Sequence, residues 1–268
     1  DIFEEFYYNL DSMTINKVRP SGRTYTVGDE IPVNGESYSY PDSFDVVVLR
    51  DKVAVKVRDR KVESIGELAD YLKNLKIEGM LVAYHGAGGA FLPEIPKYAT
   101  QNAIEYSESG GGKTLIQNFT SAFGEAFDAS VHKITNVIGE GRITIGGIAF
   151  DIRQTPEAFD VEIPEINAVY THMLGHDCHS IIAGAGHADS VIAQLKEYIA
   201  KGYDLILTSH YTPEDLKDAE TKISYIESLK TIAATCADAE TFKKEVKRRY
   251  PAYGGENYLN MTAGFFFS

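Results

Sequence analysis

Four of the seven histidines lie in one short stretch of the chain, THMLGHDCHSIIAGAGH (171–187). The stretch contains His172, His176, His179 and His187, with Asp177 and Cys178 among them. Imidazole, carboxylate and thiol groups are the ligands that zinc prefers. On a helix, His172, His176 and His179 would share one face. Any single histidine is also compatible with a hydrogen-bonded core or capping role, but the cluster as a whole predicts a functional site.

Two further histidines stand at the ends of predicted strands. His85 follows the apolar run GMLVAY (79–84) and opens HGAGGAF (85–91), and His210 ends YDLILTSH (203–210). If these strand ends meet the histidine cluster, His85, Asp177 and His210 form a metal-free acid–base group. Alternatively, His85, His176, His179 and His210 hold one metal ion.

The glycine-rich runs do not complete the phosphate or oxyanion motifs that they resemble. HGAGGAF is similar to an esterase oxyanion loop, but the chain lacks the G-x-S-x-G of the nucleophile. In a dinucleotide fingerprint, Phe91 would replace the third glycine. In SESGGGKT (107–114), Ser107 stands at the first glycine of a phosphate loop. We expect this run to be a turn between two helices, with Lys113 in solvent.

The elements that would position these residues are strands and helices in mixed order. Hydrophobic periodicity and turn residues predict them as follows: strands across 44–57 with a turn at Arg50-Asp51-Lys52, a helix at 63–76, a strand at 79–84, helices near 100–108 and 113–124, a hairpin at 142–154 turning at Gly146-Gly147, a strand pair across 158–172, a helix at 188–202 closed by Gly202, a strand at 203–210, and a helix opened by Thr212-Pro213. This order lacks regular βαβ alternation and favours a layered α/β sandwich.

Two segments resemble the metallo-β-lactamase superfamily. LVAYHGAGGAFLPEIPKYAT (81–100) is similar to the strand, metal loop and following element of that family, and YDLILTSHYTP (203–213) is similar to its last strand and terminal metal histidine. The resemblance covers residues 40–235 and rests on the order of elements. It implies an α/β fold, an αββα sandwich of two mixed β-sheets flanked by helices. The first 42 residues are rich in Tyr, Ser, Gly and Pro without a clear period, so we expect an N-terminal extension at 1–42 that packs on a single domain at 43–268.

The family's metal loop, H-x-H-x-D-H, is degenerate in this chain. His85 matches the first histidine, but Ala87, Gly89 and Ala90 stand at the next three ligand positions. Gln154 or Thr155 replaces the mid-chain histidine, and no bridging aspartate is evident near 166–172. Only His85 and His210 carry over, and two histidines are too few for a hydrolytic dinuclear centre.

The resemblance therefore predicts a divergent hydrolase-like protein that has lost most standard zinc ligands. Either a relocated site holds one zinc or other divalent metal, or the site works without metal. The alternative is a non-catalytic protein on the same fold that binds a small molecule or assembles into oligomers. The aromatic C-terminus, NYLNMTAGFFFS (257–268), would mediate homo-oligomers if it does not pack on its own domain.

Composition restricts the partners. The net charge is −13, which opposes binding to nucleic acid, and the basic run KKEVKRR (243–249) reads as a solvated helix face. No apolar run approaches the ~20 residues of a membrane span, so we expect a soluble protein with a small-molecule ligand or substrate. Cys178 and Cys236 do not decide between an exported and a cytoplasmic location.

Overall fold

The computed structural model describes residues 77–124, 127–172, 174–208 and 213–267, and the backbone of four strands within residues 30–60. The chain divides into two compact units, Asp1–His172 and Met173–Ser268. The predicted helix at 63–76 and the predicted site residue His210 lie outside the described residues. The boundary predicted between residues 42 and 43 stays a prediction.

The N-terminal strands form two antiparallel pairs. Strand β1 (Glu30–Val33) pairs with β2 (Glu36–Ser39), and β3 (Phe44–Arg50) pairs with β4 (Val53–Arg60). Arg50 and Val53 are partners in the second pair, and Asp51 and Lys52 of the predicted turn lie outside the described residues.

A three-stranded parallel sheet carries the glycine-rich loop of the first unit. Its strands are β5 (Met80–Leu81), β6 (Lys97–Thr100) and β7 (Asn136–Ile138). Strand β5 is shorter than the predicted 79–84, because the chain leaves β6 after the hydrogen bond from Val82 N–H to the carbonyl of Tyr98.

Two helices follow β6, as predicted. Helix α3 (Gln101–Glu108) is capped by the hydroxyl of Thr100, which accepts from the N–H of Ala103, and α4 (Gly111–Phe123) begins after Gly110. The run that resembles a phosphate loop is thus the junction between two helices. Lys113 is exposed, as the sequence predicts.

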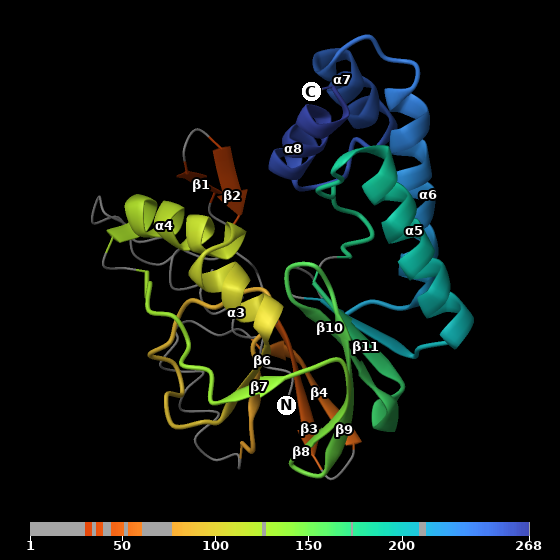
Figure 1. Ribbon diagram of the computed structural model, residues 1–268. Coiled ribbons are helices and arrows are strands. Elements are labelled where there is room, and N and C mark those ends of the chain that lie inside the picture. The colour runs from red at the N-terminus through yellow and green to blue at the C-terminus, as the bar shows by residue number, and fades with distance from the viewer. Residues whose placement is uncertain are drawn as a thin grey trace. The chain divides into compact units, whose positions relative to one another are not determined.

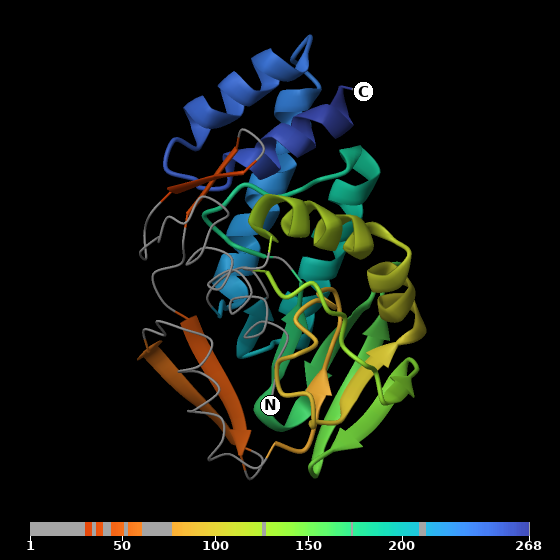
Figure 2. The ribbon, with the colours of Figure 1, turned by 90° about the vertical axis from the view of Figure 1, so that its left-hand side faces the viewer.

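An antiparallel meander forms the other sheet of this unit. Strands β8 (Gly141–Ile145), β9 (Ile148–Gln154), β10 (Phe159–Ile163) and β11 (Ala168–Thr171) pair in chain order (Figure 2). The predicted hairpin is confirmed: Gly146 and Gly147 have φ of 58° and 82° between β8 and β9. A tight two-residue turn needs this left-handed conformation, which glycine adopts at least cost. The 3-10 helix η2 (Pro164–Ile166) joins β10 to β11.

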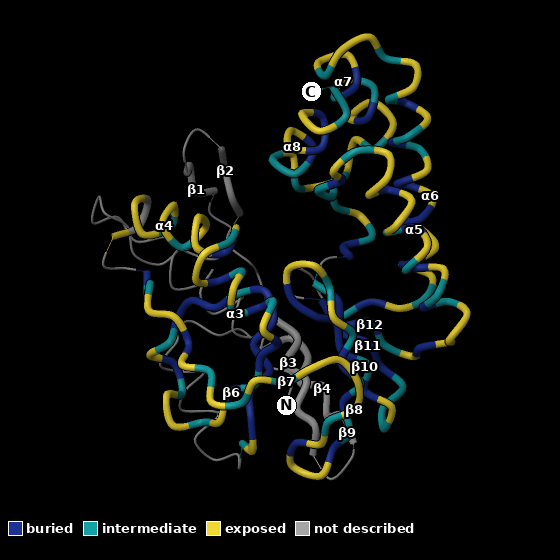
Figure 3. The backbone as a smooth tube through the Cα atoms, viewed as in Figure 1, coloured by how far each residue is buried: buried dark blue, intermediate teal, exposed yellow. Residues whose placement is uncertain are grey.

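The second unit is mainly helical (Figure 1). It contains α5 (Gly184–Lys201), β12 (Leu205–Thr208), α6 (Leu216–Ala233), α7 (Ala239–Arg249) and α8 (Glu256–Phe266). Buried and exposed positions alternate along α5 and α6 with helical spacing (Figure 3). Helix α5 ends at Gly202, as predicted, and the basic run at 243–249 ends α7 with its cations in the last turn.

One helix of this unit begins later than the sequence predicts, and His176 and His179 of the histidine cluster do not lie on a helix. Helix α6 does not open at Thr212-Pro213 but at Leu216, because the carboxylate of Asp215 accepts the N–H groups of Lys217 and Asp218 and caps the helix there. Residues 174–183 contain no helix, so His176 and His179 do not share a helical face.

The aromatic C-terminus packs in part on its own unit. The rings of Phe266 and Phe267 lie 5.8 and 5.6 Å from that of Phe242 on α7. Met261 and Phe265 on α8 are 46% and 48% exposed.

The fold class is α/β, with β-sheets and flanking helices, as predicted. Among the described residues, no helix combines the length and apolar character needed to cross a membrane.

Candidate functional site

The loop that starts at His85 is tied to residues 128–132 by backbone N–H groups. The N–H groups of Gly88 and Gly89 donate to the carbonyls of Asp128 and Ser130 at 3.0 and 2.8 Å. The N–H of Ala90 donates to Asp128 Oδ2 at 3.0 Å. Since an oxyanion site needs N–H groups that point at the ligand, this loop does not provide one.

Close packing explains the small residues of the loop. A Cβ on Gly86 would lie 2.5 Å from Ser107 Oγ on α3, and a Cβ on Gly89 would lie 2.6 Å from the carbonyl oxygen of Val131. Ala87 is 5% exposed and forms a β-bridge with Val131. Ala87 and Gly89, two of the three positions that would carry ligands in the family's metal loop, are therefore packed against the neighbouring chain, whereas Ala90 is exposed.

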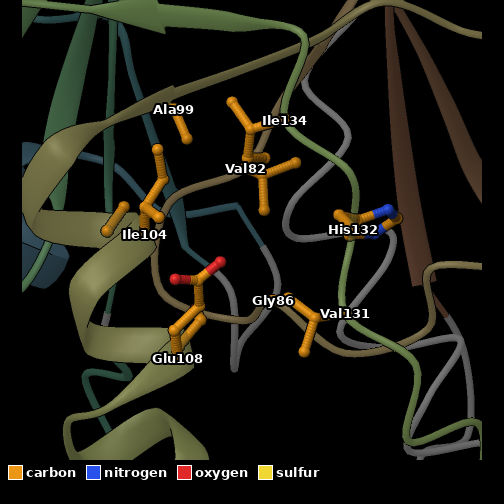
Figure 4. A pocket seen from close by; sticks show the side chains of 10 residues that line it. Val82, Gly86, Ala99, Ile104, Glu108, Val131, His132 and Ile134 are labelled. Atoms are coloured by element: carbon orange, nitrogen blue, oxygen red, sulfur yellow. The ribbon is translucent and has the colours of Figure 1, made fainter.

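A small pocket lies beside this loop (Figure 4). Its volume is about 20 Å³, which is room for about one water molecule. It is lined mainly by apolar side chains, together with Ser107, Glu108 and His132.

The structure brings His85 and His172 together. Their ring centroids lie 4.9 Å apart, and the ring of Tyr84 stacks on His172 at 4.2 Å. The hydroxyl of Tyr84 is hydrogen-bonded to Thr155 Oγ1 at 2.8 Å. Thr155, one of the two residues that the resemblance places at the family's mid-chain histidine, thus helps to position this aromatic group.

In the second unit, His176 meets two carboxylates. Its Nδ1 lies 2.8 Å from Glu214 Oε1 and 3.3 Å from Asp218 Oδ1. One donor atom from each of the three residues can be chosen so that all lie within 4.8 Å of one another. Among the described residues, this is the group of three or more histidine, cysteine or acidic side chains that is close enough to hold a metal ion.

Backbone contacts fix Glu214 at the centre of this group. Its main chain exchanges two hydrogen bonds of 2.8 Å with Ile206 of β12. Its carboxylate accepts the N–H of Gly175 at 2.8 Å and the N–H of His176 at 2.6 Å. The side chain is 1% exposed, whereas those of His176 and Asp218 are 36% and 26% exposed. A buried carboxylate thus anchors two side chains that reach solvent.

Burial and hydrogen bonds act in opposite directions on the pKa values of His176 and Glu214. Burial lowers the pKa of His176, but the hydrogen bond to Glu214 and the charges of Asp218 and Asp177 outweigh it and raise that pKa. Burial raises the pKa of Glu214, although the N–H groups that donate hydrogen bonds to its carboxylate oppose the rise.

The remaining predicted site residues have other surroundings. Asp177 is exposed, with Oδ2 at 4.0 Å from His176 Nε2. His179 is 2% exposed, and its Nδ1 lies 2.8 Å from the hydroxyl of Tyr225. Burial and the charge of Lys222 lower the pKa of His179 to about 4. The Nδ1 of His187 accepts the N–H of Ala183 at the start of α5.

Glu214 and Asp218 are not among the site residues that the sequence predicts. Both lie in PEDLKD (213–218), just after the segment that resembles the family's last strand. The sequence signal was the acidic character of this run. The acidic run does not by itself predict a site, because only the fold places Glu214 and Asp218 beside His176.

The chain is similar to several solved structures. A metallo-β-lactamase from Pontibacter korlensis matches with 14% identity and a TM-score of 0.46, over 74% of this chain and 92% of that chain. The inverting sec-alkylsulfatase Pisa1 from Pseudomonas sp. matches with 13% identity and a TM-score of 0.49, over 75% and 43% of the two chains. A double mutant of the sec-alkyl sulfatase PisA1 matches with 12% identity and a TM-score of 0.51, over 85% and 49%.

The chain has the metallo-β-lactamase fold. It spans about half the length of the alkylsulfatases that it matches, 43% and 49%. No protein-family model matches the sequence, and no curated protein does either. At these identities the metallo-β-lactamase fold is what the comparison establishes, as the two resembling segments of the sequence predict.

Proposed function

We propose that this protein is a divergent hydrolase of the metallo-β-lactamase fold that holds a single divalent metal ion through His176, Glu214 and Asp218. The observation that supports the proposal is the convergence of one imidazole and two carboxylates within 4.8 Å. The metal loop cannot provide the usual ligands, because Ala87, Gly89 and Ala90 occupy their positions. The proposed centre is thus a relocated one.

The donor set suits a catalytic cation. Histidine nitrogen and carboxylate oxygen are common zinc ligands, and catalytic zinc sites keep three protein ligands and one open position. Bound there, a divalent ion would act as a Lewis acid and lower the pKa of a water molecule. Glu214 would anchor the group from the buried side, while His176 and Asp218 face solvent, where a small-molecule substrate has access.

Metal content and affinity test the proposal. Protein purified without chelator should contain about one equivalent of zinc, manganese or iron, and apo-protein should bind Zn²⁺ in a calorimetric titration. His176→Ala and Asp218→Asn should each weaken Zn²⁺ binding by about 10-fold or more, because each removes a ligand. His187→Ala, a histidine outside the group, is the matched control. Unchanged affinity in both ligand variants would contradict the assignment.

Hydrolysis is tested separately with small substrates. The fold is shared with a sec-alkyl sulfatase, so p-nitrophenyl sulfate, p-nitrophenyl phosphate and p-nitrophenyl acetate form a suitable first panel. We expect metal-dependent turnover of at least one ester, lost in His176→Ala. Turnover that survives chelation would place hydrolysis away from the metal.

A second candidate function is assembly without chemistry. The exposed Met261 and Phe265, one turn apart on α8, favour it, because they form an apolar surface at the aromatic C-terminus. In this reading the protein is a homo-oligomer or a small-molecule-binding protein, and the histidine cluster is structural.

A further inference from the structure

Hydrogen bonds from its main chain to Gly254 and Thr262 hold the loop at residues 178–182 of the second unit in place. The N–H of His179 donates to the carbonyl of Gly254 at 2.8 Å. The hydroxyl of Thr262 on α8 accepts the N–H of Ile182 at 2.8 Å and donates to the carbonyl of Ser180 at 2.6 Å. Ser180, which is half-buried, is therefore presented by a fixed backbone.

A buried lysine reaches this serine from α6. Lys222 is 1% exposed, and its Nζ lies 2.7 Å from Ser180 Oγ and 2.6 Å from the carbonyl oxygen of Cys178. The ring of Tyr225 lies 4.9 Å from the same nitrogen. Among the described residues, Lys222 makes no ion pair with a carboxylate. A buried ammonium without a counter-ion is costly, and burial lowers the pKa of Lys222 to about 8.

The two oxygen partners of Lys222 differ in chemistry. A carbonyl oxygen only accepts, so Nζ must donate an N–H to Cys178. A serine hydroxyl can donate or accept, so the lone pair of a neutral amine can accept the Ser180 proton. Covalent hydrolysis uses a nucleophile, a base in contact with it, and a third group that orients the base. Ser180, Lys222 and the carbonyl of Cys178 have this arrangement. Serine–lysine pairs are a known variant of it.

We propose that Ser180 is a nucleophile and Lys222 its general base, forming a hydrolytic site for acyl esters that is distinct from the metal centre. Lys222 Nζ takes the Ser180 hydroxyl proton as Oγ forms a bond to the ester carbonyl carbon. The bond from that carbon to the alkoxy oxygen of the ester then breaks as the Lys222 ammonium gives its proton to that oxygen, and the alcohol leaves. A water molecule, deprotonated by the same amine, then cleaves the acyl–Ser180 ester to a carboxylic acid and free serine.

A fluorophosphonate probe tests the proposal, since it phosphonylates activated serines. Incubation of the full chain should give one phosphonyl adduct by intact mass, which peptide mapping places on Ser180. Ser180→Ala should remove the adduct, and Ser190→Ala, an exposed serine on α5, should keep it. Lys222→Met should slow labelling by about 100-fold, the usual contribution of a general base, whereas Lys217→Met on the same helix should not.

The outcomes separate this proposal from the metal proposal. Labelling of Ser180 that persists in excess chelator supports an independent site, whether or not the protein binds Zn²⁺. No adduct on the wild-type protein, or an adduct on another serine, overturns the proposal. Because the wild-type result is read directly, it stands even if Lys222→Met fails to fold. Labelling of a folded Lys222→Met at the wild-type rate would overturn the role of the lysine.

Discussion

At the scale of single residues, burial decides which histidines can carry charge. His132 is 4% exposed, and burial, together with the charge of Lys97, lowers its pKa to about 3. His176 is half-exposed beside carboxylates, and its pKa is raised. Residue type alone therefore does not distinguish a site histidine from a core histidine.

His132 makes a pH prediction with a defined sign. Its folded pKa of about 3 lies below the ordinary value of 6.5. Between these values the unfolded chain binds a proton that the folded chain does not, so stability falls as the pH falls. From pH 6.5 to pH 4 the wild type should lose about 3 kcal/mol more than His132→Gln, at ~1.4 kcal/mol per unit. Urea unfolding at both pH values measures this, and equal losses would contradict it.

At the scale of elements, close contact with α3 fixes the glycine-rich loop. The sequence suggested that its small residues mark lost ligands, and the structure adds that they also allow the loop to pack. Gly86 has Ser107 within 2.5 Å of its would-be Cβ, whereas Gly186 on α5 has nothing within 4 Å.

Alanine substitutions at these glycines should act in opposite directions. Gly86→Ala should destabilise the protein by about 1–3 kcal/mol, because it overpacks a filled space. Gly186→Ala should stabilise it by about 0.5–1 kcal/mol, because alanine is the better helix former and no neighbour obstructs it. Chemical denaturation of the two variants measures both effects. A neutral Gly86→Ala would show that α3 yields to the added methyl group.

A turn or a helix end is predictable from the sequence where the backbone preference of the residue at that position decides it. The Gly146-Gly147 turn and the end of α5 at Gly202 follow from the positive φ that glycine adopts. Helix α6 begins later than Thr212-Pro213 predicts, because Pro at a first turn is a weaker signal than the capping box of Asp215 and Asp218.

At the scale of the whole molecule, the order of elements predicted the metallo-β-lactamase fold, because fold depends on the sequence of strands and helices rather than on ligands. The candidate site could not be predicted in the same way. His176 was singled out from the sequence, but Glu214 and Asp218 lie about 40 residues further along the chain, and only tertiary contacts bring them to it.

The assembly candidate is also tested on the whole molecule. If α8 forms an interface, the protein should have a dimer or higher mass by light scattering. Replacing Met261 and Phe265 with serine should reduce that mass to the monomer, because both side chains are exposed and neither substitution opens the core. A monomer mass in both proteins would remove this candidate.

Anomalous diffraction at the zinc edge tests the central claim most directly. Crystals of the wild-type protein grown with Zn²⁺ should show one peak about 2.0–2.2 Å from a nitrogen of His176 and from carboxylate oxygens of Glu214 and Asp218. The peak should disappear in His176→Ala. A map without density at this group, or with zinc bound elsewhere in its place, would contradict the relocated metal centre.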